Sequence, residues 1–229
     1  MTVEQYYNDN PLEVWKQVLG PKMHYHYGSY SDDNIFDQTV RNLYPHIDNN
    51  SSILDMGCGW GGPATLLTNE KGCNVHGVTN SVQQHELTTF PTTLIDVHDY
   101  IPQQQYDTAI FIQSLTHFAD APTVLKNIRP YVKRIIISDF LWEGGGYSKD
   151  WYMTFRTYKT FHELVSQHYE IKMLKEDKQI DLHNTCKFWY NNIKKLPKDQ
   201  VVTQIKNLYD LSVATLAGLE YKFITIVAE

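Results

Sequence analysis

One short segment, Ile53 to Gly62, constrains the fold of this chain more than any other. An apolar run closes on Asp55, and glycines follow at positions 57, 59, 61 and 62 before a stretch of helical length. Glycine is needed where the backbone turns at positive φ and where a ligand must approach without meeting a Cβ atom. The helix that follows would direct free N–H groups and its positive dipole end toward the turn. The segment therefore predicts a strand, turn and helix that hold a nucleotide-like ligand at the carboxyl edge of a parallel sheet.

The rest of the chain has the alternation that such a sheet requires. Short β-branched runs separated by helix-length stretches indicate βαβ units. These runs are Ile53–Met56, Asn74–Val78, Thr93–Ile95, Ala109–Ile112 and Arg134–Ser138. We therefore expect the α/β fold class: a Rossmann-like, doubly wound, mostly parallel sheet with a final antiparallel strand and a helical cap or lid.

The flanking segments predict the cap and the end of the sheet. Residues 1–50 read as an N-terminal helical cap segment, and residues 51–229 as the main domain, with lid helices at about 182–217. Apolar periodicity predicts helices at Pro11–Leu19, Asn34–Tyr44, Trp151–His168 (through Phe155, Tyr158, Phe161, Leu164 and Val165), Leu182–Ile193 and from about Lys198 (through Val201, Ile205, Leu208 and Leu211). Further strands are expected at Tyr169–Leu174 and Tyr221–Val227.

Charge and cysteine content restrict the partners. The formal net charge of −6 provides no basic surface for a nucleic-acid backbone, so a small-molecule substrate is expected and nucleic acid is not. Three cysteines without Cys-x-x-Cys spacing imply neither a disulfide framework nor a metal site. The N-terminus lacks a signal-peptide pattern and no segment reaches the length of a membrane span, which favours a cytoplasmic protein. Nothing in the sequence indicates the oligomeric state.

The glycine pattern alone leaves two kinds of nucleotide ligand open. Gly57, Gly59 and Gly62 satisfy Gly-x-Gly-x-x-Gly, so an NAD(P)-dependent oxidoreductase is one alternative. Two features favour another ligand. Asp55 puts a carboxylate beside the turn, which suits an ammonium group better than a pyrophosphate. The stretch Gly77–Gln84 also lacks the acid with which a dehydrogenase usually holds the adenosine ribose.

These segments resemble a known family. Leu54–Gly62 is similar to the glycine motif of class I S-adenosylmethionine-dependent methyltransferases. Gly77–Gln84 and Gln113–Phe118 resemble the branch that includes cyclopropane fatty acid synthases, tocopherol-type enzymes and small-molecule methyltransferases. The resemblance covers about residues 20–140. It implies S-adenosyl-L-methionine as cofactor, S-adenosyl-L-homocysteine as product, and methylation of an O, N or C atom of a small molecule or natural product.

The resemblance also implies roles for individual residues. Asp55, Gly57 and Gly59 would line the methionine half of the cofactor, with Trp60 alongside. Ribose hydroxyls would be met by Thr79, Asn80 and Gln84. Asp96 matches the acid of the adenine site by its position at a strand end, and Asp99 is nearly as good by spacing. Gln113 would face the methionine end of the cofactor.

Methyl transfer from a sulfonium is an in-line displacement, so an enzyme mostly needs to hold the acceptor in place, and some acceptors must also lose a proton. His117 is the natural first candidate for a base, although the same residue in relatives looks structural. Asp139 could orient or deprotonate an acceptor, or could cap the helix that follows. Tyr25 and His26 lie in a run that resembles the segment closing over the cofactor.

Two observations limit the reaction. Cyclopropane synthases have a Glu directly before the His of the fourth-strand motif, whereas this chain has Thr116, which makes lipid cyclopropanation doubtful. A cofactor-binding protein that does not methylate, such as a cyclase or a regulatory module, is a further alternative.

Overall fold

The computed structural model of the chain describes residues 11–148, 153–200, 203–219 and 222–229. Within them, seven strands form one sheet in the order β3-β2-β1-β4-β5-β9-β8. All neighbours from β3 to β5 are parallel, whereas β9 is antiparallel to both β5 and β8. This confirms the predicted mostly parallel sheet with a final antiparallel strand. The strands are β1 (Ser52–Met56), β2 (Asn74–Thr79), β3 (Thr92–Leu94), β4 (Tyr106–Ile112), β5 (Val132–Leu141), β8 (Ile171–Glu176) and β9 (Lys222–Ala228).

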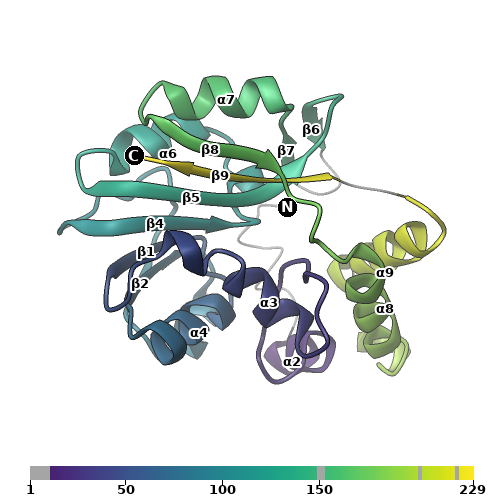
Figure 1. Cartoon of the computed structure of the whole chain (residues 1–229). Helices are drawn as coiled ribbons and strands as arrows, with labels where there is room; N and C mark the ends of the chain where they lie inside the picture. The colour runs from purple at the N-terminus through teal and green to yellow at the C-terminus, as the bar shows by residue number, and fades with distance from the viewer. Residues whose placement is uncertain (1–10, 149–152, 201–202, 220–221) are drawn as a thin grey trace.

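Helices cover both faces of the sheet because successive strand residues point to opposite sides. In β1, Ile53 belongs to an apolar core cluster built with α3 (Ile35–Arg41) and α4 (Gly62–Lys71). Leu54 belongs to one built with α6 (Ala121–Ile128) and α7 (Tyr158–Ser166). Figure 1 shows α7 over one face and α4 below the other. Also beside the sheet are α5 (Val82–Leu87) and the short 3-10 turns η1 (Tyr44–His46) and η2 (Leu115–His117).

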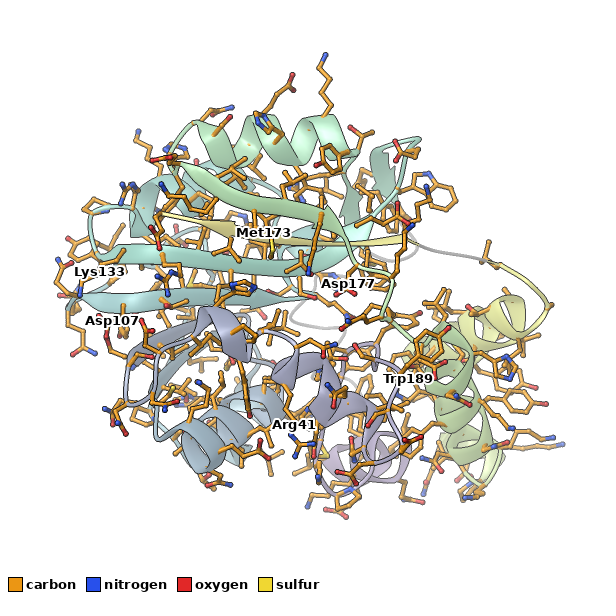
Figure 2. The ribbon with its side chains drawn as sticks, viewed as in Figure 1. Arg41, Asp107, Lys133, Met173, Asp177 and Trp189 are labelled. Carbon is orange, nitrogen blue, oxygen red and sulfur yellow. The ribbon has the colours of Figure 1, made fainter. Side chains whose placement is uncertain are left out.

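A third apolar cluster lies where the parallel strands end. It joins α2 (Leu12–Leu19), α8 (Leu182–Ile193) and α9 (Thr203–Leu216) to Phe140 of β5 and Phe223 of β9. Figure 1 shows these three helices grouped on the side where β4 finishes. Figure 2 shows Trp189 of α8 on that side, and Asp107 and Lys133, which form a 2.7 Å ion pair, at the opposite end of the sheet. A further 3-10 turn, η3 (Lys198–Gln200), separates α8 from α9.

One predicted helix begins later than its periodicity suggests. The prediction from Trp151 to His168 is wrong at its start, because β6 (Gly146–Ser148) and β7 (Met153–Phe155) form a hairpin. Phe155 is therefore a strand residue, and its ring meets that of Phe140 with centroids 6.3 Å apart. α7 starts only after Thr157, whose side chain accepts the Thr160 N–H in a capping box.

Parts of other predictions lie outside the described residues: positions 1–10, Trp151, Val201 and Tyr221. The predicted helix at Leu182–Ile193 is confirmed, and the one expected from about Lys198 starts as α9 after η3. Asp181 and Asn34 cap α8 and α3 by accepting backbone N–H groups, as short polar residues before a helix do. In the described part of the chain, no helix combines the length and apolarity needed to cross a bilayer.

Candidate functional site

A cavity of about 350 Å³ lies at the carboxyl ends of β1, β2 and β4. Its wall consists of the turns after β1, β2, β3 and β4, closed by the segment Met23–Gly28, which we call the strap. Every residue that the sequence analysis assigned to a binding or catalytic role lines this cavity except Asp139. Asp96 lines it, whereas Asp99, the alternative, does not. The roles of these residues stay predictions, but the fold brings nearly all of them together.

Asp55 is a buried residue of the cavity wall, and one of its carboxylate oxygens has no hydrogen bond to a described residue. Its side chain is 2% exposed, and Oδ2 has no partner among the described residues. Burial raises the pKa of this carboxyl to about 7. A buried carboxylate oxygen with no donor is costly, so the position suits a ligand that brings a positive charge or an N–H group.

The glycine turn leaves open space beside this carboxyl. Gly59 has a φ of 55°, and a Cβ atom placed there would meet nothing within 4 Å. The turn is anchored because the N–H groups of Gly57 and Cys58 both donate to the carbonyl of Val78 in β2, at 3.0 and 3.1 Å. The opening at Gly59 is thus a feature of a fixed turn, and a side chain there would enter the cavity.

The loop after β2 is organised by a side-chain pair. The Thr79 hydroxyl donates to Oε1 of Gln84 at 2.6 Å and accepts the Ser81 N–H at 3.1 Å. Ser81 in turn caps α5. Thr79 and Gln84 are both buried, while Asn80 between them is only partly buried and also lines the cavity. The hydrogen bond between Thr79 and Gln84 therefore fixes the backbone around Asn80, which lines the cavity.

The strap carries two buried histidines with different partners. Nε2 of His24 lies 2.9 Å from Asp37, whose carboxylate also pairs with Lys22. Nε2 of His26 lies 3.0 Å from the carbonyl of Phe36. Since a carbonyl only accepts, Nε2 of His26 carries the proton and Nδ1 is a hydrogen-bond acceptor. Burial lowers the pKa of His26 to about 3, which keeps this ring neutral and suits it to hydrogen bonding more than to proton transfer.

Asp139 lies behind the cavity and holds the turn that carries His117. Its carboxylate accepts the Thr116 N–H at 3.0 Å, the Thr116 hydroxyl at 3.1 Å and the Phe140 N–H at 2.8 Å. Burial raises its pKa to about 6, opposed by these hydrogen bonds and by the charge of Arg156. The catalytic role proposed for Asp139 stays a prediction, and its contacts in the structure are to backbone and to one hydroxyl.

Sequence reasoning missed two polar residues at the site. Arg156 is buried and donates to the carbonyls of Leu115 and Phe118 at 3.2 and 3.5 Å, on either side of His117. His98 lines the cavity two residues after Asp96. Arg156 gives no local signal because its partners are distant in sequence. His98 could have been noticed, since polar residues just after a strand of a parallel sheet lie at the ligand edge.

Comparison with known proteins gives one family. A family model described as a methyltransferase domain matches residues 27–177. Among curated proteins, (S)-coclaurine N-methyltransferase of Papaver somniferum is 28% identical over 141 residues, which are 54% of this chain and 40% of that protein. The chain thus spans less than half the length of this relative.

Solved structures show the same fold at low sequence identity. The cyclase SpnF superposes with a TM-score of 0.85 at 14% identity, covering 99% of this chain and 95% of that one. Coclaurine N-methyltransferase bound to N-methylheliamine and SAH superposes with a TM-score of 0.77 at 15% identity, covering 96% and 82%. At such identities the likeness shows the fold alone.

Proposed function

This chain belongs to the methyltransferase domain family, and on that premise we propose that it transfers a methyl group from S-adenosylmethionine to a small-molecule acceptor. The observation that carries the proposal is the partnerless Oδ2 of Asp55 beside the open space at Gly59. The ammonium group of S-adenosylmethionine would form an ion pair and a hydrogen bond with this carboxylate. The cofactor can come close to the backbone only where the turn has no side chain.

The residues present fit the rest of this cofactor. Asp55, Gly57 and Gly59 would hold its methionine half, with the Trp60 ring alongside. The ribose hydroxyls would be held by Thr79, Asn80 and Gln84, the adenine by Asp96, and the methionine end would face Gln113. Bound in this way, the cofactor supplies an electrophilic methyl group. The protein's own part is to orient the acceptor, exclude water and accept a proton where the acceptor must lose one.

The acceptor is a neutral amine or hydroxyl compound in this proposal. The titratable side chains of the cavity wall are carboxyls, imidazoles, a phenol and a thiol, which match an N–H or O–H group better than a phosphate or carboxylate. Nδ1 of His26 would accept such a hydrogen, and His117, Tyr25 and Asp139 are the candidates for taking the proton. Amines come first because the curated relative is named as an N-methyltransferase.

A second candidate is cofactor binding without methylation. The similar fold of the cyclase SpnF supports it, because a fold does not determine the chemistry that its site performs. Formation of S-adenosylhomocysteine that depends on an added acceptor separates the two functions.

The test combines calorimetry with a turnover assay. S-adenosylmethionine and S-adenosylhomocysteine should bind the wild-type chain, and Asp55→Ala should bind neither while remaining cooperatively folded. Incubation with a panel of primary and secondary amines should then release S-adenosylhomocysteine with at least one member. Normal affinity in Asp55→Ala would contradict the cofactor assignment. Tight binding without turnover on amines, phenols or carbon acids would favour the second candidate.

The division of the chain and its location complete the proposal. Residues 1–50 form the cap segment, 51–229 the main domain and 182–217 the lid helices, acting in the cytoplasm on a small molecule. Limited proteolysis with and without S-adenosylhomocysteine tests the division, since cuts in the cap and lid should slow when the cofactor is bound. Cell fractionation tests the location.

A further inference from the structure

The hydrogen-bond partners of the His98 ring select one tautomer. The N–H of Asp120 donates to Nε2 of His98 at 3.1 Å. An amide N–H cannot accept, so Nε2 must be without a proton and the ring proton must be on Nδ1. Nδ1 lies 2.5 Å from Oδ1 of Asp96 and therefore donates to it. The hydrogen bond from the Asp120 N–H thus makes Nδ1 of His98 the donor to the Asp96 carboxylate.

The carboxylate of Asp96 is held by this ring on one side only. Its Oδ1 accepts both the Nδ1–H and the backbone N–H of His98, the latter at 2.9 Å. Its Oδ2 has no hydrogen bond to any described residue, and Asp96 lines the cavity. One oxygen is therefore fixed by the protein, whereas the other is open to solvent or to a ligand in the cavity, because the Asp96 side chain is 51% exposed.

His98 is itself fixed from three directions. Besides the Asp120 N–H, its carbonyl accepts the side chain of Asn127 at 3.0 Å, and its ring meets the Phe118 ring edge to face at 6.2 Å. Phe118 is buried and belongs to the cavity wall. Asp120 and Asn127 belong to the cap and body of α6. Contacts with the N-cap and body of α6 therefore orient the His98 ring and, through it, the Asp96 carboxylate.

We propose that His98 is the positioning residue that makes the purine end of this cavity specific for a 6-amino purine, by holding Asp96 with its Oδ2 available to the exocyclic amino group. This rests on the proposed function, which puts the adenine of the cofactor here. A 6-oxo purine presents an oxygen at the same place, so two acceptors would face each other with no proton between them. Discrimination between the two purines is therefore the property that His98 controls.

The experiment compares S-adenosylhomocysteine with S-inosylhomocysteine, its 6-oxo analogue, by calorimetry on the full chain. Wild type should prefer the adenosyl compound by at least about tenfold. His98→Gln keeps an acceptor near the Nε2 position but loses the Nδ1 donor, so its preference should fall below about threefold. His98→Asn keeps a donor near the Nδ1 position and should retain most of the preference. His85→Gln, an imidazole replacement outside the cavity wall, is the matched control and should leave the preference unchanged.

Asp96→Asn gives a second route if His98→Gln fails to fold. Its amide can donate to a 6-oxo group, so the preference should shift toward the inosyl compound. Equal wild-type affinities for the two compounds, or an unchanged preference in folded His98→Gln, would overturn the proposal while leaving the methyltransferase assignment intact. Failure of the wild type to bind S-adenosylhomocysteine at all would overturn both.

Discussion

The side-chain amide of Gln113 spans the backbone of Tyr27: Oε1 accepts the Tyr27 N–H at 2.7 Å, and Nε2 donates to the Tyr27 carbonyl at 3.4 Å. Gln113 directly follows β4 and has a φ of 52°, a conformation that is strained for a residue with a side chain. The next strap residue, Gly28, donates to Thr185 of α8 and accepts from Asp181. The strap is therefore tied both to the sheet and to the lid helices.

Loss of the Gln113 amide should loosen the strap without unfolding the protein. Gln113→Ala is expected to weaken S-adenosylhomocysteine binding about tenfold, because two buried hydrogen bonds to the strap are lost. Gln113→Gly loses the same bonds but relieves the positive φ, so it should be about 1 kcal/mol more stable than Gln113→Ala at equal ligand affinity. Calorimetry and thermal melts measure the two effects. Wild-type affinity in both variants would show that the strap closes without Gln113.

Cofactor binding should depend on pH through Asp55. The raised pKa of about 7 means that the ligand-free carboxyl is mostly protonated at pH 6. A cationic ligand needs the charged form, so binding at pH 6 should release nearly one proton, and the Kd should rise about tenfold per pH unit below 7. Calorimetry in buffers of different ionisation enthalpy counts the proton. Asp55→Asn should bind weakly at every pH, and a pH-independent wild-type Kd would contradict the assignment.

The same carboxyl should affect the stability of the ligand-free protein. A folded-state pKa above the unfolded value of about 3.8 favours folding of the protonated form, so this contribution is present below pH 4 and is lost as pH rises to about 7. Asp55→Asn removes the cost of burying a charge. It should raise the melting temperature by at least roughly 2–4 °C at pH 8 and by less at pH 5. A lower melting temperature at pH 8 would show that Asp55 stabilises the empty site.

The sheet and most of the cavity wall are predictable because both depend on local pattern. Strands such as β1 and β4 are largely buried and mostly apolar, although each also contains an aspartate. The last residues of these strands and those directly after them lie at one sheet edge, which is why Asp55, near the end of β1, and Gln113, directly after β4, line one cavity. The hairpin β6–β7 is not predictable in this way. Phe155 continues the apolar spacing of α7, but it is used as a strand residue against Phe140.

The long-range hydrogen bonds that position the cavity residues are harder to predict from the sequence. The strap reaches the cavity through contacts such as the one between Gln113 and Tyr27, which are 86 residues apart. Asp139 is hydrogen-bonded to Thr116, directly before His117, although its position in the last part of β5 suits an active-site group equally well. Such pairings depend on tertiary packing, and no local propensity reports them.

An alanine substitution should mainly lower ligand affinity at Gly59 and mainly lower the stability of the fold at Gly62. At Gly59 an added Cβ meets nothing within 4 Å, so Gly59→Ala should stay folded, at a cost of about 1 kcal/mol for its positive φ. Its methyl group would occupy cofactor space, and affinity should fall at least about 100-fold. At Gly62 a Cβ would lie 2.5 Å from Nδ1 of buried His24, so Gly62→Ala should destabilise the fold by about 1–3 kcal/mol. Denaturant titration and calorimetry on both variants check this; a reversed pattern would place the ligand away from Gly59.

The final prediction concerns the turn that carries His117. Asp139 accepts hydrogen bonds from the N–H and the hydroxyl of Thr116 in this turn. Arg156 donates hydrogen bonds to the carbonyls of Leu115 and Phe118. If Asp139 acts by holding this turn, the Thr116 hydroxyl shares the role. If Asp139 accepts a proton from the acceptor, the hydroxyl is of little importance.

Thr116→Val removes the hydroxyl donor at nearly constant volume and should lower kcat about tenfold, since a hydrogen bond to a buried carboxylate is lost. The KM for S-adenosylmethionine should change by less than about twofold, because Thr116 does not line the cavity. Thr116→Ser keeps the donor and should restore kcat.

Asp139→Asn should slow turnover more than it weakens cofactor binding. If the pH profile of kcat loses its inflection near pH 6 in this variant alone, Asp139 is a proton acceptor instead. Normal turnover in Thr116→Val beside an inactive, folded Asp139→Asn would exclude the holding role.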